Sequence, residues 1–282
     1  MQEELLHIFP LHLRETLQKV TMKENTLEEI RIRIGQPVIF HMENEEWYLK
    51  KETGRLERSQ VNAYCATKED IKSMVKFISS YSLYAYEDEM KRGFITMQGG
   101  HRIGVAGQVV MDGGKVLSLS NIYFLNIRVA REKRGCAKDI IPYLIHRNNI
   151  YNTLFVSPPG IGKTTYLRDA IRILSNGSDR LHGMKISIID ERSEIAACRQ
   201  GIPQNDIGIR SDVLDGCLKS FGMLLMLRSM APQIIAVDEI GSREDCRAME
   251  QAIYSGSRII GTVHAYDMKE LSRKKYLKEM LE

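Results

Sequence analysis

The stretch VSPPGIGKTT, residues 156–165, determines how the second half of this 282-residue chain is expected to fold. It closely matches the phosphate-binding loop G-x-x-x-x-G-K-[ST], which requires a strand before it and a helix after it. The apolar run TLFV (153–156) and the helical pattern KTTYLRDAIRILSNG (163–177) supply that context. One position departs from the pattern, because Ser157 stands where the first glycine is expected. The stretch therefore predicts a phosphate-binding loop between a strand and an amphipathic helix.

This loop predicts ligands for both a nucleotide and a metal ion. The backbone N–H groups of residues 159–164 are expected to point at the β-phosphate, helped by the positive end of the following helix. We expect Lys163 to neutralise the β/γ oxygens and the Thr164 hydroxyl to ligate Mg²⁺. A serine is tolerable at the start of the turn, because the backbone comes closest to the phosphate at Gly160 and Gly162. The predicted nucleotide-binding residues are Ser157, Pro158, Pro159, Gly160, Ile161, Gly162, Lys163, Thr164 and Thr165.

A second motif, QIIAVDEI (233–240), has the Walker B form, an apolar strand that runs into Asp238-Glu239. Asp238 is expected to hold Mg²⁺ through water, and Glu239 to position or deprotonate the attacking water. The acidic pair favours ATP hydrolysis over nucleotide binding alone. A guanine-reading pattern, [NT]-K-x-D, occurs at residues 67–70, but it precedes the loop and caps a predicted helix. ATP is therefore the expected nucleotide.

Four short apolar runs alternate with longer helical stretches after about residue 145. They are TLFV, KISIID, QIIAVD and RIIGTV. Continuous apolar strands separated by helices predict a parallel sheet covered on both faces. Because the carboxyl ends of parallel strands share one edge, Arg192 and Glu194 after the second run and His264 after the fourth are expected beside the phosphate-binding loop.

The first half of the chain predicts a mixed α+β domain. LEEIRIRIGQPVIF (27–40) alternates apolar and polar residues like a strand and its turn, and residues 66–86 have helical spacing after the N-cap Thr67. Residues 92–130 alternate in short stretches broken by Gly-Gly pairs, which indicates hairpins. We therefore expect an N-terminal α+β domain over 1–147 and an α/β domain over 148–282.

Composition narrows the functional classes without choosing one. A hydrophobic content of 43%, a charged content of 27% and a net charge of +4 are ordinary for a globular protein and do not require a nucleic-acid partner. Five scattered cysteines without a C-x-x-C pair suggest neither a zinc site nor a disulfide framework. No run approaches the ~20 apolar residues that span a bilayer.

The order of the motifs resembles a known family. Phosphate-binding loop, acidic strand end, Asp-Glu strand and T-x-H-A follow one another as in the secretion ATPases of type II and type IV systems, a hexameric RecA-like group. Their Asp box and His box correspond to residues 190–194 and 262–265. Segments over nearly the whole chain are also similar to the stage III sporulation ATPases of endospore-forming bacteria; among them are LEEIRIRIGQPV, GGHRIGVAGQVV, SPPGIGKTTYLRDAIRILS, IDERSEIA and LRSMAPQIIAVDEIG.

The resemblance implies a RecA-like P-loop ATPase domain with a parallel sheet, preceded by a smaller α+β N-terminal domain. It implies a homo-hexamer that uses ATP and Mg²⁺ on the cytoplasmic, mother-cell side, and that powers the channel between mother cell and forespore. Membrane association is expected through membrane proteins of that channel. Two departures stand out: Asp238-Glu239 replaces the Gly-Glu that many secretion ATPases carry, and a further strand would be expected after YLKEMLE (276–282).

Arginines are expected to complete the site, some of them from a neighbouring subunit, because hydrolysis spreads negative charge over the γ-phosphoryl oxygens. The candidates are Arg192, Arg210 and Arg228 in the ATPase domain and Arg102, Arg128 and Arg131 in the N-terminal domain. Arg192 and Arg228 are favoured by their places in the segments that resemble the Asp box and the arginine before Walker B. The predicted catalytic residues are Lys163, Arg192, Glu194, Arg228, Glu239 and His264, and the predicted metal ligands are Thr164 and Asp238.

Two alternatives from other functional classes remain open on the sequence. A nucleic-acid-dependent ATPase with the same core is one, although no motif for nucleic-acid binding accompanies the slight positive charge. A nucleotide-gated scaffold without turnover is the other. Loss of Lys163 or Glu239 would favour the scaffold, and both residues are present.

Overall fold

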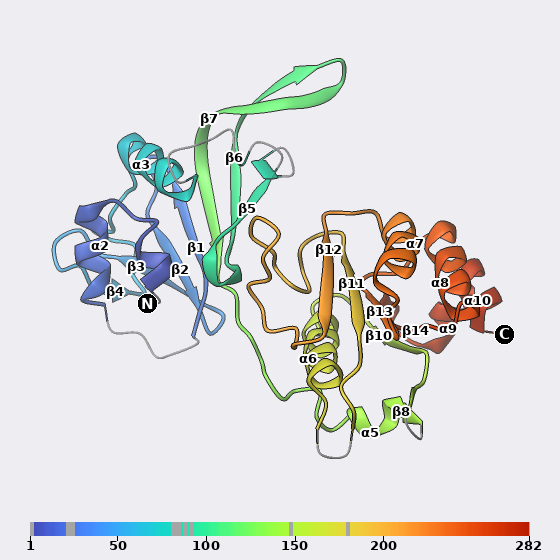
Figure 1. Cartoon of the computed structure of the whole chain (residues 1–282). Helices are drawn as coiled ribbons and strands as arrows, with labels where there is room; N and C mark the ends of the chain where they lie inside the picture. Colours follow the sequence, from blue (N-terminus) through green and yellow to red (C-terminus); the bar gives the residue numbers. More distant parts are fainter. Residues whose placement is uncertain are drawn as a thin grey trace. The chain divides into compact units, whose positions relative to one another are not determined.

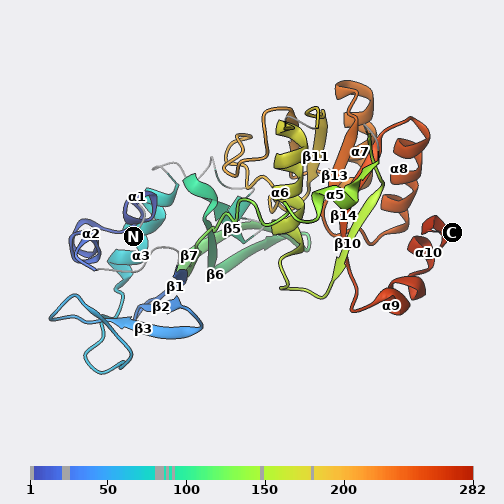
Figure 2. The same cartoon turned by 90° about the horizontal axis from the view of Figure 1, so that it is seen from below.

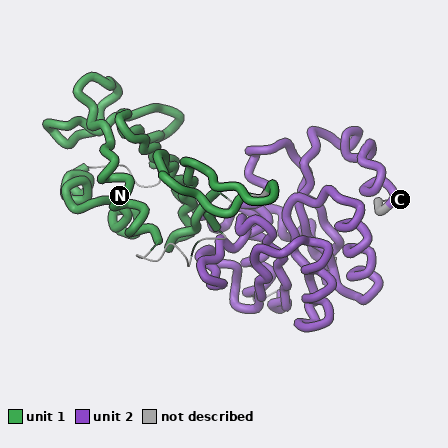
Figure 3. Tube along the Cα trace, turned by 90° about the horizontal axis from the view of Figure 1, so that it is seen from above, with its two compact units in different colours: residues 1–131 green, residues 132–282 purple. Residues whose placement is uncertain are grey.

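The chain divides into two compact units, residues 1–131 and 132–282, each with apolar core residues of its own (Figure 3). The computed structural model describes residues 3–20, 26–79, 86, 89–90, 93–146, 149–178 and 181–281. The sequence placed the boundary later, between residues 147 and 148. The intervening stretch belongs to the second unit because the Ala137 amide donates to Asp169 at 2.8 Å, and because Ile141 and Leu144 pack into the core of that unit.

The first unit is built on one antiparallel sheet with the order β4-β3-β2-β1-β7-β6-β5 (Figure 1). Its strands are β1 (Leu27–Arg33), β2 (Ile39–Met42), β3 (Glu45–Leu49), β4 (Leu56–Glu57), β5 (Phe94–Thr96), β6 (Arg102–Asp112) and β7 (Lys115–Arg128). The α-helices that the structure describes in this unit are α1 (Glu3–Leu6), α2 (Leu11–Gln18) and α3 (Lys68–Ile78). Leu17 of α2 and Met74 of α3 share one core with Ile30 and Ile127 of the central strands. This is the α+β domain that the sequence predicts.

Helix α3 begins where the sequence places its N-cap. The Asp70 amide donates to the Thr67 hydroxyl at 3.1 Å, and the Thr67 amide donates to the Asp70 carboxylate at 2.8 Å. These contacts form a capping box. The predicted helix extended to residue 86, but α3 ends at Ile78, and residues 80–85 lie outside the described residues. The guanine-reading pattern is therefore a helix cap.

The second unit contains a five-stranded parallel sheet with the order β10-β14-β13-β11-β12. Its strands are β10 (Thr153–Ser157), β11 (Ile186–Asp190), β12 (Ser211–Asp215), β13 (Ile234–Val237) and β14 (Arg258–His264). The four predicted strands are confirmed. The sequence missed β12, because SDVLD carries too few apolar residues to stand out and the strand lies at the edge of the sheet.

Helices cover both faces of this sheet (Figure 2). The principal ones are α6 (Lys163–Asn176), α7 (Lys219–Met230) and α8 (Arg243–Tyr254), followed by α9 (Met268–Arg273) and α10 (Lys275–Leu281). A short helix, α5 (Ile141–Leu144), and a small two-stranded sheet of β8 (Ile145–His146) and β9 (Asn149–Ile150) precede β10. In β11, Ile188 packs in the core shared with α6, whereas Ile189 packs in the core shared with α7 and α8. Burial on both sides explains why the strands read as continuous apolar runs.

Helix α7 packs closely on β11 through Gly222. A Cβ atom at this position would lie 2.7 Å from Cγ2 of Ile189. We expect Gly222→Ala to destabilise the second unit by about 1–3 kcal/mol, because a close-packed core accommodates an added methyl group only with strain. The measurement is urea unfolding followed by circular dichroism, since the single tryptophan, Trp47, lies in the other unit.

Ser229→Ala is the control for that substitution. Ser229 is an exposed residue of the same helix, and its hydroxyl bonds only to the Leu225 carbonyl. Its removal is expected to change stability by less than about 0.5 kcal/mol. Equal stability of Gly222→Ala and the parent protein would show that the helix is free to move away from the sheet.

Candidate nucleotide-binding and catalytic site

The functional side chains predicted from the phosphate-binding loop and the acidic strand ends gather at the carboxyl edge of the parallel sheet. Strand β14 lies between β10, which leads into the loop, and β13, which leads into Asp238. The register pairs Ser157 of β10 with His264 of β14. The two nucleotide motifs are thus separated by one strand, and side chains from the end of that strand stand between them.

The phosphate-binding loop has the backbone conformation that its glycines permit. Gly160 and Gly162 have φ values of 80° and 95°, in the left-handed region where a side chain is strained. Gly162 is the N-cap of α6, so the helix begins at Lys163. Pro159, Gly160 and Ile161 are exposed, which leaves this part of the loop open to solvent.

Lys163 is folded back on its own loop. Its ammonium donates to the carbonyl oxygens of Ser157 at 2.7 Å and Pro158 at 2.8 Å, and to the Ser157 hydroxyl at 3.3 Å. Burial lowers the pKa of Lys163, and the nearby charges of Asp238 and Glu239 oppose that shift. The two shortest contacts are to backbone atoms, so they do not depend on the side chain of Ser157.

Thr164 and Asp238 bring the two motifs into direct contact. The Thr164 hydroxyl donates to Oδ2 of Asp238 at 2.7 Å. A hydroxyl and a carboxylate are hard oxygen ligands, and Mg²⁺ is typically held by one or two such groups together with waters and substrate phosphates. Among the described residues no group of three or more His, Cys, Asp or Glu side chains is placed to hold a metal ion. The hydroxyl of Thr164 and the carboxylate of Asp238 fit the oxygen ligands that a nucleotide-bound Mg²⁺ ion would need.

Thr262, the first residue of the T-x-H-A motif, orients the acidic pair, a role that the sequence did not predict. Its hydroxyl donates to Oδ1 of Asp238 and accepts the Glu239 amide at 2.8 Å. The residue is fully buried in the middle of β14, where the neighbouring residues Ile260, Gly261 and Val263 are apolar. A polar residue within an apolar run was the sequence feature that could have indicated this role. Its contacts help to hold Glu239 at a φ of 51°, a conformation that a non-glycine residue adopts only when its surroundings hold it there.

Both carboxylate oxygens of Glu239 are bonded. Oε1 lies 3.0 Å from Nε2 of His264, and Oε2 accepts from Nη1 of Arg192 at 2.6 Å. Burial acts to raise the pKa of Glu239, but the hydrogen bond with His264 and the charge of Arg192 outweigh it and lower the pKa below its ordinary value. Glu239 is therefore an ionised acceptor at neutral pH, suited to orient a water molecule.

Asp190 fixes the loop that carries Arg192. Its buried carboxylate accepts the amides of Glu194 at 2.7 Å, Ile195 at 3.0 Å and Ala196 at 2.8 Å. Burial raises the pKa of Asp190, while these backbone hydrogen bonds oppose the shift. Arg168 of α6, which the sequence did not suggest, donates to the carbonyls of Glu194 and Ile195, each at 2.6 Å. The loop is thereby tied to the helix that begins with Lys163.

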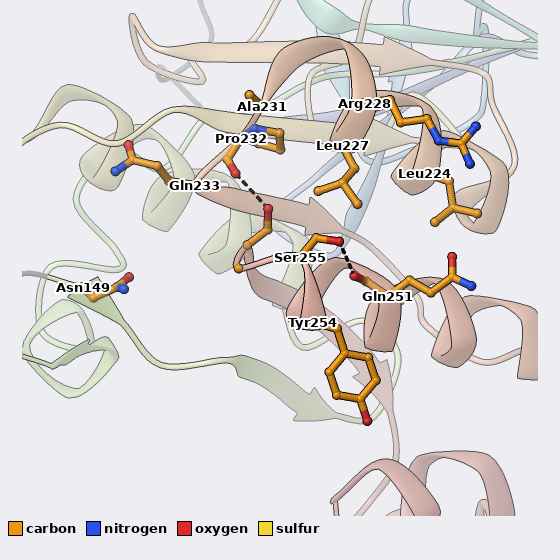
Figure 4. Close-up of a pocket in the computed structure, with 12 residues that line it drawn as sticks. Asn149, Leu224, Leu227, Arg228, Ala231, Pro232, Gln233, Gln251, Tyr254 and Ser255 are labelled. Carbon is orange, nitrogen blue, oxygen red and sulfur yellow. Dashed lines mark hydrogen bonds between the residues drawn. The ribbon is translucent and has the colours of Figure 1, made fainter.

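Arg228 lies apart from the other predicted catalytic residues. It belongs to the last turn of α7 and lines a pocket of about 920 Å³ with Leu224, Leu227 and Tyr254 (Figure 4). Pro232 and Gln233, which precede β13, also line this pocket, so it lies toward the amino ends of the strands. Within one chain, Arg228 is therefore at the end of the sheet opposite to Asp238.

The other arginines that the sequence suggests for the catalytic site make different contacts. Arg210 donates to the Ser175 and Asn176 carbonyls at the end of α6, at 2.9 and 3.2 Å. Arg131 donates to the Thr26 and Leu27 carbonyls in the first unit. In that unit the guanidinium of Arg102 lies 4.0 Å from the centre of the Phe94 ring, and Arg128 is exposed.

A phosphate-binding loop, an acidic strand end in contact with it, and an intervening strand that carries a histidine define a P-loop protein with the RecA-like fold of secretion and motor ATPases. Solved structures share this fold. The ATPase DotB of Legionella pneumophila has a TM-score of 0.54 and 16% identity, over 93% of this chain and 66% of that chain. The pilus retraction motor PilT with bound ADP has a TM-score of 0.62 and 14% identity, over 99% of this chain and 74% of that chain.

The chain belongs to the family described as sporulation stage III, protein AA, whose family model matches residues 1–282. A curated relative is the stage III sporulation protein AA of Bacillus subtilis (strain 168). It is 39% identical over 99% of this chain and 87% of its own length. No helix among the residues that the structure describes is both long enough and apolar enough to cross a membrane.

Lys163 and Ser157 are expected to differ sharply in their effects on nucleotide binding. Lys163→Ala should abolish tight Mg·ATP binding, because the phosphates lose their cationic partner. Ser157→Gly restores the strict motif and should change the dissociation constant less than tenfold, which corresponds to about 1.4 kcal/mol. Isothermal titration calorimetry with Mg·ATP measures both. A larger effect of Ser157→Gly would show that its side chain shapes the loop, and unchanged binding by Lys163→Ala would place the nucleotide elsewhere.

Proposed function

We propose that this protein hydrolyses ATP with Mg²⁺ at the site between Lys163 and Glu239. We further propose that it works as a hexameric motor that powers the channel between mother cell and forespore during endospore formation. The observation that carries the enzymatic part is the contact of Thr164 with Asp238 beside an ionised Glu239. The sporulation role rests on the family and on its Bacillus subtilis relative.

Each residue of the loop has a distinct proposed task. The amides of residues 159–164 and the Lys163 ammonium bind the phosphates, for which the lysine exchanges its present contacts with the Ser157 and Pro158 carbonyls. Thr164 and Asp238 would hold Mg²⁺. When bound, that ion supplies positive charge to the β- and γ-phosphate oxygens.

Glu239 is the proposed group that orients the attacking water and accepts its proton. Its carboxylate is bonded to Arg192 and His264, and each of its oxygens has a second lone pair that can accept a hydrogen bond from a water. Arg192 is the exposed partner and is the one expected to turn toward the γ-phosphoryl group. His264 then keeps the carboxylate in position. Glu194 lines a small cavity together with Arg192 and Glu239, and it is proposed to support this arrangement.

In the proposed hexamer, arginines from a neighbouring subunit complete the nucleotide site. Arg192 touches Glu239 of its own chain, so it is proposed to act within its own site. Arg228 is at the other end of the sheet, so any contact with a nucleotide must come from an adjacent copy. Arg102 and Arg128 of the first unit are further candidates, whereas Arg131 and Arg210 are bonded to backbone carbonyls. Contact with membrane proteins on the mother-cell side completes the proposal, and no nucleic-acid partner is expected.

Glu239→Gln is expected to bind Mg·ATP with nearly the affinity of the parent protein but to release phosphate about 10²–10⁴ times more slowly, because the general base is lost. Phosphate release at saturating ATP measures this, with and without added DNA. Glu244→Gln, an exposed residue at the start of α8, is the control and should keep the parent rate. An unchanged rate for Glu239→Gln would remove Glu239 from the chemistry, and strong stimulation by DNA would favour a nucleic-acid-dependent ATPase.

Mixing inactive variants tests whether Arg228 acts between subunits. Arg228→Ala and Glu239→Gln should each be slow alone, but a mixture should regain part of the activity. Some interfaces then pair an intact Arg228 with an intact Glu239. A mixture of Arg192→Ala with Glu239→Gln should regain nothing, because both side chains belong to one site. Recovery in the second mixture, or none in the first, would contradict this division of roles.

A further inference from the structure

Lys219 is a largely buried cation beside the proposed catalytic residues, and no sequence motif points to it. It is the first residue of α7, shortly after the end of β12. Its side chain is 13% exposed, and its ammonium donates to Oε2 of Glu191. Glu191 directly follows β11 and precedes Arg192 in the chain. The lysine is therefore held at the carboxyl edge of the sheet, paired with a residue of the loop that carries Arg192.

A single small cavity joins Lys219 to the site. All the residues that line this cavity have acidic or basic side chains. They are Asp190, Glu191, Arg192, Glu194, Lys219, Asp238 and Glu239. Two cation–carboxylate pairs meet there, Arg192 with Glu239 and Lys219 with Glu191.

The charge of Lys219 does not stabilise α7, the helix that begins with this residue. A cation at the amino end of a helix is opposed by the helix dipole, and burying an ammonium costs free energy unless it is paired. Leu218 at the N-cap makes no side-chain hydrogen bond to the first turn, whereas α3 and α8 begin with capping boxes. The amino end of α7 thus combines an uncapped first turn with a paired, buried lysine, which together suit a bound anion.

We propose that Lys219 is a catalytic residue that contacts the γ-phosphoryl group of ATP, with Glu191 holding its ammonium in place. This inference rests on the proposed ATP hydrolysis. In that reaction the oxygen of water bonds to the γ-phosphorus, the bond from the γ-phosphorus to the bridging oxygen of ADP breaks, and Glu239 accepts the proton of the water. Lys219 keeps its own proton and neutralises charge on the γ-phosphoryl oxygens. Lys163, by contrast, begins α6 directly after the loop whose amides are proposed to bind the phosphates.

The decisive substitution is Lys219→Met, which keeps much of the length of the side chain and removes its charge. Because ADP lacks the γ-phosphoryl group, the affinity for the magnesium complex of the non-hydrolysable triphosphate AMPPNP should fall tenfold or more, while that for Mg·ADP stays the same. The rate of phosphate release at saturating ATP should fall about 10²–10³-fold, as when one charge-stabilising donor is removed from an active site. Lys219→Arg should recover most of the triphosphate affinity, because it restores the charge.

Two further variants complete the experiment. Lys275→Met removes an exposed lysine at the first position of α10 and should change neither affinity nor rate. Glu191→Gln loosens the lysine without removing its charge, so it should reduce the rate by a smaller factor than Lys219→Met. Calorimetry with AMPPNP and ADP gives the affinities, and melting temperature shows whether each variant is folded.

The outcomes separate this inference from the proposed function. If Lys219→Met is folded and binds the triphosphate and ADP with the parent ratio of affinities, Lys219 does not contact the γ-phosphoryl group and the inference is wrong. If Lys219→Met fails to fold, Glu191→Gln decides through the same ratio: a fall in the affinity for the triphosphate relative to ADP supports the contact, and the parent ratio overturns it. If the parent protein hydrolyses no ATP, the proposed function fails, while the affinity ratio still tests the contact.

Discussion

The hydrogen bond from Thr164 to Asp238 is the interaction on which the proposed site depends. It joins side chains 74 positions apart in the chain, one at the start of α6 and one at the end of β13. The contact requires β10 and β13 to be separated by one strand only, and β14 occupies that place. The sheet order thus brings the helix start that follows the phosphate-binding loop into contact with the acidic pair. It also decides that Thr262 and His264 lie between them.

The polar groups of the site are held by reciprocal hydrogen bonds at the rim of an apolar sheet. Burying a carboxylate is costly unless its oxygens are paired. Asp190 meets this requirement with three backbone amides, and Glu239 meets it with an arginine and a histidine. Arg168 extends the network to α6, so the loop bearing Arg192 is attached to the helix that begins with Lys163. If bound phosphate displaced that helix, the loop that carries Arg192 would therefore move with it.

The sequence predicts the motifs and the strands of the second unit because these depend on local patterns: apolar runs, glycine spacing and acids at strand ends. It misses β12, which is short, polar and at the sheet edge. It also misses Arg168 and Lys219, and it misses the role of Thr262 in holding the acidic pair, because these contacts are made with partners distant in the chain. Arg192 was expected as a candidate for action between subunits, but its contact with Glu239 within one chain depends on the loop held by Asp190. Such pairings follow from the sheet order, which no local pattern contains.

The central claim is that Asp238 and Thr164 form the metal-dependent part of an ATP-hydrolysing site. Phosphate release from ATP, measured against Mg²⁺ concentration, tests it most directly when the parent protein is compared with Asp238→Asn and Asp212→Asn. Asp212 is an exposed residue of β12, away from the loop. We expect Mg²⁺-dependent release by the parent protein and by Asp212→Asn, and a loss of release in Asp238→Asn. Release by Asp238→Asn at the parent rate, or none from the parent protein at any Mg²⁺ concentration, would contradict this claim.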